Sequence, residues 1–255
     1  MGKKMGRRYW LTGAGNGLGE SLAEALLKSG ARLAISALQS CQALSERYPG
    51  QVLAVPGNLT DSQTVRETCQ QITQQWGALD TVIINAGTAE YVPEQLVDHT
   101  VIEHIVRSNL LVASLCIDAA LPLLRAGTTP HLVGITSPLT HLPPSRIEAG
   151  GNGMRYLFES ARVDLAGDGI DVTLVHPAFD IPSPNLDDCF VAPVHWSVET
   201  AANHILTRLS DHPQELAFPA AAMTNLWPLP TSTEAGQTDT VSDRARDGYP
   251  IKGQP

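Results

Sequence analysis

The fold is decided by residues 9–19, which read YWLTGAGNGLG. A short apolar run is followed there by a glycine-rich turn and by the first residues of a helical pattern. Closely spaced glycines let the backbone approach a bulky anion, and the N–H groups at the start of the helix face it with the positive end of the helix dipole behind them. The stretch therefore predicts a strand, a turn and a helix that together cradle a dinucleotide pyrophosphate.

Strand-like and helix-like segments alternate along the rest of the chain. Buried strands are predicted after the first one at 32–36, 51–56, 79–84, 131–136, 170–175 and 215–218. Helices are predicted between them, near 18–29, 39–47, 60–76, 101–124, 152–165 and 197–209. Such alternation predicts an α/β fold of the Rossmann type, a doubly wound parallel sheet with right-handed crossovers and helices on both faces.

A single folded domain is expected, flanked by two less regular segments. The chain has 255 residues, a length that doubly wound sheets reach without dividing. Residues 1–8 carry Lys3, Lys4, Arg7 and Arg8 and are predicted to form a solvated basic arm. Residues 9–224 form the predicted domain. Residues 225–255 are rich in Pro, Thr, Ser, Gly and Asp, and we expect a disordered or loosely packed tail.

Composition excludes several functional classes. A net charge of −9 argues against a nucleic-acid surface, and no apolar run reaches membrane-spanning length. Cysteines are scattered without CxxC spacing, so we expect free thiols in the cytoplasm and no metal site. They are Cys41, Cys69, Cys116 and Cys189.

Several further motifs occur in one order along the chain. Residues 12–19 read TGAGNGLG, residues 85–87 read NAG, and Asn58-Leu59 follows the third predicted strand. In this order and spacing the chain resembles the short-chain dehydrogenase/reductase family from about residue 9 to residue 218. The resemblance implies binding of NAD(P)(H) by Thr12, Gly13, Gly15, Asn16, Gly17, Leu18, Gly19, Ser36, Asn58, Leu59, Asn85, Ala86, Gly87 and Pro177.

The resemblance also implies a catalytic set, of which only half is present. Asn109 and Ser137 match the family's Asn and Ser. The Tyr that transfers a proton and the Lys that lowers its pKa fall on Ile147 and Gly151, which can do neither. The usual Tyr-Lys mechanism is therefore predicted to be disabled. Ser137 and Asn109 are either remnants that bind a carbonyl or ordinary structural polar residues.

Cofactor choice rests on the end of the second strand, Ser36-Ala37-Leu38. No acid is present there to bind a ribose 2′-hydroxyl and reject a phosphate. The absence of that acid gives a slight preference for NADP(H) over NAD(H), with Asn16 and Ser36 as polar contacts.

Three functional hypotheses follow. The first is an oxidoreductase that moves a hydride between NAD(P)(H) and a small carbonyl or alcohol substrate, with Ser137 plus water or His141 replacing the missing Tyr. The second is a non-catalytic pseudoenzyme that senses the nucleotide or serves as a partner subunit. The third is a structural subunit without turnover. The family resemblance implies a homo-oligomer, a dimer or a tetramer, in each case.

Overall fold

A computed structural model of the chain describes residues 6–15, 17–37, 42–85, 107–136, 153–178 and 197–219. The first half contains β1 (Arg8–Thr12), α1 (Gly17–Lys28), β2 (Arg32–Ser36), α2 (Gln42–Arg47), β3 (Val52–Ala54), α3 (Ser62–Trp76) and β4 (Thr81–Asn85). The second half contains a π-helical turn (Arg107–Leu111), α5 (Val112–Arg125), β5 (His131–Ile135), α6 (Gly153–Leu165), a 3₁₀ turn (Ala166–Asp168), β6 (Asp171–Ala178), α7 (Val198–Leu209) and β7 (Glu215–Pro219).

The seven strands form one sheet in the order β3-β2-β1-β4-β5-β6-β7. Every neighbouring pair is parallel. Strands β2 and β3 lie on one side of β1, and β4 to β7 lie on its other side, so the strand order reverses between β1 and β4. The predicted doubly wound parallel sheet is confirmed, and the crevice expected for a ligand lies at the carboxyl ends of β1 and β4.

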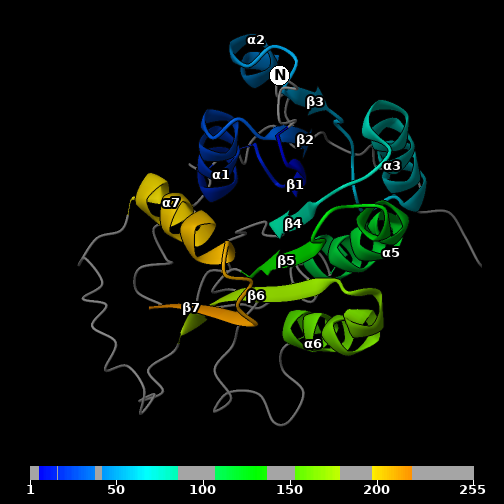
Figure 1. The fold of residues 1–255 in the computed structure, drawn as a ribbon, viewed down its shortest axis with the longest axis vertical. Coiled ribbons are helices and arrows are strands. Elements are labelled where there is room, and N and C mark those ends of the chain that lie inside the picture. Colours follow the sequence, from blue (N-terminus) through cyan, green and yellow to red (C-terminus); the bar gives the residue numbers. More distant parts are fainter. Residues whose placement is uncertain are drawn as a thin grey trace, which may run out of the picture.

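Two helical layers cover the sheet (Figure 1). Helices α1 and α7 bury one apolar cluster, with Leu22 and Ile205 among its members. Helices α3, α5 and α6 bury the other, around Trp10 and Phe158. A Cβ on Gly134 would lie 2.3 Å from the Phe158 ring, so this glycine of β5 lets α6 approach the sheet closely.

Helix ends follow the local sequence closely. Asp61 caps α3 by accepting hydrogen bonds from the N–H groups of Gln63 and Thr64, and Gly77 ends it in the left-handed conformation. Ser197 caps α7 by accepting from the N–H of Thr200. None of the helices that the structure describes is long and apolar enough to cross a membrane.

The arginines next to the first strand differ from the prediction. Strand β1 begins at Arg8, and the Arg8 guanidinium forms an ion pair with Asp80 at 2.7 Å. Arg7 donates to Thr81 Oγ1 at 2.9 Å and to the Thr129 carbonyl at 2.7 Å. The prediction of a solvated arm was therefore wrong for Arg7 and Arg8, because both side chains find oxygen acceptors on segments remote in sequence.

Candidate functional site

The glycine loop joins β1 to α1 at the carboxyl edge of the sheet. Gly13 and Gly17 have φ angles of +65° and +53°, a backbone conformation that L side chains rarely adopt. A Cβ on Gly13 would lie 2.3 Å from the Asn85 carbonyl oxygen, and a Cβ on Gly19 would lie 1.9 Å from the Gly13 carbonyl oxygen. Glycine is therefore required at these three positions for the loop to pass between the ends of the strands.

Hydrogen bonds hold the loop in place from both sides. The Gly13 N–H donates to the Ser36 carbonyl at 3.0 Å, and Asn85 Nδ2 donates to the Gly13 carbonyl at 3.0 Å. The loop is thus tied to the ends of β2 and β4. Gly15 is exposed, and the described atom nearest to a Cβ placed on it is Ala37 Cβ at 3.6 Å. This part of the loop is open to a ligand.

Two buried side-chain oxygens beside the loop have no hydrogen-bond partner within the part of the chain that the structure describes. Thr12 Oγ1 is buried, with the residue 1% exposed, and Asn85 Oδ1 is also buried. Neither atom has a hydrogen-bond partner among the described residues. A buried polar atom left without a partner costs about 1–3 kcal/mol, so these atoms mark a place where a ligand would complete the bonding.

Asn109 occupies the π-helical turn that precedes α5. The residue is 2% exposed, and both amide atoms, Oδ1 and Nδ2, lack partners within the described residues. The alternative role as a hydrogen-bonded tie between helix and strand is not seen there. A π-helical turn inserts an extra residue into a helix and is frequent at functional sites. The sequence contained no pattern that predicted this turn.

Ser36 has a hydrogen-bond partner that no pattern in the sequence indicated. The indole Nε1 of Trp10 donates to Ser36 Oγ at 3.0 Å, and both side chains are buried. A hydroxyl that accepts one bond still has its own proton to donate. The Ser36 hydroxyl can therefore donate to a further acceptor.

The Asn58-Leu59 pair follows β3 with two different roles. Leu59 is buried in the cluster under α3 and α5. Asn58 is exposed, and its Oδ1 accepts from the Thr60 N–H at 3.0 Å and from Thr60 Oγ1 at 2.8 Å. Because these bonds occupy the oxygen, the amide nitrogen of Asn58 is the atom best placed to meet a ligand.

Of the other predicted residues, Leu18 and Pro177 are described by the structure, and the rest are not. Leu18 is buried in the core, so its contribution to a ligand site is its backbone N–H. Pro177 lies in β6 opposite Phe218 of β7. The remaining predicted positions lie outside the described residues: Asn16, Ala86, Gly87, Ser137, His141, Ile147 and Gly151.

The two thiols that the structure describes are free and buried. They belong to Cys69 and Cys116, and burial raises the pKa of Cys69 to about 12. Both thiols are therefore protonated and unreactive near neutral pH. No group of three metal-ligating side chains occurs within residues 6–15, 17–37, 42–85, 107–136, 153–178 and 197–219.

Known proteins are similar to this chain in sequence. The family model for short chain dehydrogenase matches residues 9–180. An uncharacterized oxidoreductase of Myxococcus xanthus is 30% identical over 181 residues, which cover 68% of this chain and 72% of that protein.

Two solved structures share the fold. A short-chain dehydrogenase from Streptomyces avermitilis has a TM-score of 0.70 at 21% identity, covering 87% of this chain and 91% of that one. A metagenomic short-chain oxidoreductase in complex with NADP has a TM-score of 0.66 at 19% identity, covering 85% of this chain and 97% of that one.

Proposed function

This chain belongs to the short-chain dehydrogenase family, and we propose that it binds NAD(P)(H) at the carboxyl edge of its sheet. The observation that carries the proposal is the glycine loop with its unpartnered neighbours. Gly13, Gly17 and the N-terminus of α1 would hold the pyrophosphate, and Thr12 Oγ1 and Asn85 Oδ1 are buried beside it without described partners. A bound nicotinamide nucleotide supplies hydride-transfer chemistry.

The nucleotide would be NADP(H) in preference to NAD(H). The end of β2 has no acid that would repel a 2′-phosphate. The Ser36 hydroxyl retains a proton to donate after accepting from Trp10. Asn58 Nδ2 would donate to an acceptor nitrogen of the adenine ring, since Asn58 Oδ1 is occupied by Thr60.

We propose that this chain lacks turnover by the usual Tyr-Lys proton relay. Ile147 has no acidic proton and Gly151 has no charge, so a small carbonyl or alcohol bound beside the nicotinamide would lack its proton donor. Ser137 and Asn109 would still bind the substrate oxygen. The second candidate function, a nucleotide-binding pseudoenzyme in the cytoplasm, is favoured by this same loss.

Nucleotide titration tests the proposal. We expect NADPH, and more weakly NADH, to change the intrinsic fluorescence saturably, because Trp10 lies against Ser36 at the end of β2. No saturable change with either nucleotide, confirmed by calorimetry, would contradict the proposal.

Gly15 provides a matched pair of variants. Gly15→Asp and Gly15→Asn add side chains of the same size at the open position of the loop. We expect Gly15→Asp to weaken NADPH binding by at least about tenfold relative to Gly15→Asn, because a carboxylate opposes the phosphates. Equal affinities would place the phosphates elsewhere.

His141 supplies a test of the remaining catalytic alternative. If turnover of aldehydes, ketones or quinones is measurable, we expect His141→Ala to leave the rate unchanged. A large fall would make His141 the proton donor and would contradict our proposal that the relay is lost.

Assembly into a homo-oligomer, a dimer or a tetramer, is proposed through α6. Tyr156 and Val163 are 75% and 77% exposed and lie seven residues apart on this helix, which places them on one face. Large exposed apolar side chains in a row are typical of a covered surface. Val163→Glu is expected to shift the mass measured by light scattering to that of a smaller species. An unchanged mass would exclude this face.

A further inference from the structure

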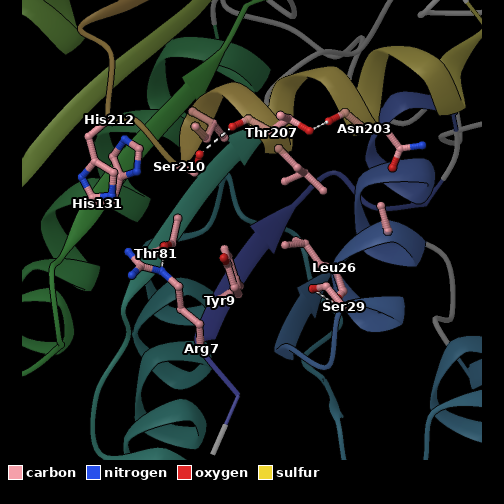
Figure 2. Close-up of a pocket in the computed structure, with 13 residues that line it drawn as sticks. Arg7, Tyr9, Leu26, Ser29, Thr81, His131, Asn203, Thr207, Ser210 and His212 are labelled. Atoms are coloured by element: carbon pink, nitrogen blue, oxygen red, sulfur yellow. Dashed lines mark hydrogen bonds between the residues drawn. The ribbon is translucent and has the colours of Figure 1, made fainter.

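A cavity of about 480 Å³ lies at the amino edge of the sheet, away from the glycine loop. We call it the amino-edge cavity. Its walls are the starts of β1, β4 and β5, represented by Tyr9, Thr81 and His131, and the last turns of α1 and α7 (Figure 2). The length of β1 separates it from the loop, roughly 13 Å at 3.3 Å per residue. A cavity of this volume accommodates a small organic molecule.

Arg7 provides the positive charge of the cavity. No Asp, Glu, Lys or second Arg side chain is among the described residues that line the cavity. Its guanidinium donates to four neutral oxygens: Thr81 Oγ1, Thr129 Oγ1, and the carbonyls of Asp80 and Thr129. One of its five N–H groups remains.

The nearby carboxylate of Asp80 is paired with Arg8 and not with Arg7. Its oxygens accept from the Arg8 backbone N–H, Arg8 Nε and Arg8 NH2, and from the Thr128 N–H. Of the two arginines at the start of β1, Arg8 pairs with this carboxylate, and Arg7 contacts only the Asp80 backbone carbonyl. The charge of Arg7 is left for an anion.

Two stacked imidazoles close the same side of the cavity. His131 and His212 have ring centroids 4.2 Å apart, and His212 Nδ1 lies 2.6 Å from Asp171 Oδ2. Burial first, and then the charges of His212 and Arg7, lower the pKa of His131 to about 3. His131 is thus a neutral flat wall, and a second cation is disfavoured beside Arg7.

The ends of α1 and α7 offer hydrogen-bond acceptors to the cavity. The hydroxyls of Ser29, Thr207 and Ser210 donate to helix carbonyls at 2.7, 2.8 and 2.7 Å, respectively, so each oxygen keeps lone pairs that can accept. The last turns of α1 and α7 carry the negative ends of their dipoles here. Leu26 and Leu206 supply apolar surface to the cavity.

We propose that the amino-edge cavity binds a small organic carboxylate with an apolar body and a hydrogen-bond donor at its far end. The carboxylate lies toward Arg7, the body contacts Tyr9, Leu26 and Leu206, and the donor meets the hydroxyls at the ends of α1 and α7. The charge of Arg7 and the acceptor oxygens at the helix ends set this orientation. This site is separate from the nucleotide site at the carboxyl edge.

Calorimetry with 4-hydroxybenzoate tests the proposal, because this probe has all three features. We expect saturable binding in the millimolar range or below. Benzoate, which lacks the donor, is expected to bind a few-fold more weakly, and 4-hydroxybenzyl alcohol, which lacks the charge, at least about tenfold more weakly. No binding of 4-hydroxybenzoate, or equal binding of the uncharged alcohol, would overturn the proposal.

Variants locate the bound probe. Thr207→Trp places an indole in the cavity and is expected to abolish binding. The matched control is Thr73→Trp on α3, which is expected to leave binding intact. Thr73 is also exposed, and its hydroxyl, like that of Thr207, donates to the carbonyl four residues before it. Arg7→Gln is expected to weaken binding at least about tenfold and Arg7→Lys less, because lysine keeps the charge.

Arg7 also ties β1 to Thr81 and Thr129, so its variants can lose stability. The Thr207→Trp result decides the location independently of Arg7. Unchanged binding in Thr207→Trp would overturn the proposal. NADPH affinity of the same variants, measured in parallel, is expected to stay at the wild-type value, which separates this site from the proposed nucleotide site.

Discussion

The buried polar groups at the two edges of the sheet differ in whether they have hydrogen-bond partners among the described residues. At the amino edge, Asp80 accepts four hydrogen bonds from Arg8 and Thr128. At the carboxyl edge, Thr12 Oγ1 and Asn85 Oδ1 are buried without partners among the described residues. Both edges belong to the same strands, since β1 runs from Arg8 to Thr12 and β4 from Thr81 to Asn85.

The hydrogen bonds around Asp80 contribute to stability, whereas the unpartnered atoms beside the glycine loop are available to a ligand. A saturated network fixes the relative position of β1, β4 and the residues before β5, and it stabilises the fold. Unsatisfied polar atoms lower the stability of the free protein and gain their partners when a ligand binds. The amino edge therefore acts as the anchor of the strands, and the carboxyl edge holds the proposed nucleotide.

The largest expected effect is at the carboxyl edge. The double variant Ile147→Tyr with Gly151→Lys restores the proton donor and the cation that lowers its pKa. We expect NADPH-dependent reduction of a carbonyl panel to rise by about 10²–10⁴-fold, the usual contribution of a positioned general acid. The control is Ile147→Phe with Gly151→Lys, which has the ring without the hydroxyl. A rise in that control, or none in the Tyr variant, would contradict the assigned positions.

The next largest effect is at the amino edge. Asp80→Asn removes the charge that Arg8 requires, with both side chains largely buried. We expect the free energy of unfolding, measured with urea, to fall by about 2–3 kcal/mol. The matched control is Asp168→Asn, which breaks the exposed ion pair with Arg125 and is expected to cost clearly less. Equal losses would remove the distinction between this network and the surface.

The pH dependence of this network has a definite sign. Burial alone raises the pKa of Asp80, but the hydrogen bonds from Arg8 and Thr128 and the charge of Arg8 outweigh it and lower the pKa below its ordinary 3.8. A lowered carboxyl pKa stabilises the fold above the unfolded value and loses this contribution as pH falls through the folded value. The stability difference between wild type and Asp80→Asn is therefore expected to shrink below about pH 4. A constant difference down to pH 2 would refute this.

The smallest expected effect compares two buried threonines. Thr12→Val removes a hydroxyl without a described partner, so the free energy of unfolding should stay unchanged or rise by up to about 1 kcal/mol, while NADPH binding weakens. Thr136→Val removes a hydroxyl that donates to the Val175 carbonyl at 3.2 Å, so it should cost about 1 kcal/mol. Thermal unfolding of both variants checks the sign. A loss at Thr12 as large as at Thr136 would show that its hydroxyl serves the fold.

Much of the fold could be predicted because its signals are local. Apolar runs placed the strands to within about two residues at most ends, and capping residues placed the starts of α3 and α7. The glycine turn between β1 and α1 was predicted, since positive φ angles and close packing leave few residue types other than glycine at Gly13 and Gly19.

The partners of polar side chains could not be predicted in this way. Trp10 and Ser36 are 26 residues apart, and Arg8 and Asp80 are 72 apart. Their contact depends on which strands become neighbours in the sheet. The π-helical turn at Asn109 likewise departs from the regular helix that the apolar pattern predicted.

The sequence by itself determined the succession of strands and helices along the chain and the glycine turn between β1 and α1, because each depends on residue types at fixed short spacing. Only the tertiary structure decided which polar groups are satisfied. Parallel pairing of β1 with β4 brings Asp80 to Arg8 at one edge and Asn85 to Gly13 at the other. The contrast between the hydrogen-bonded Asp80 network and the unpartnered atoms beside the glycine loop therefore arises from strand pairing, which joins residues that the chain keeps far apart.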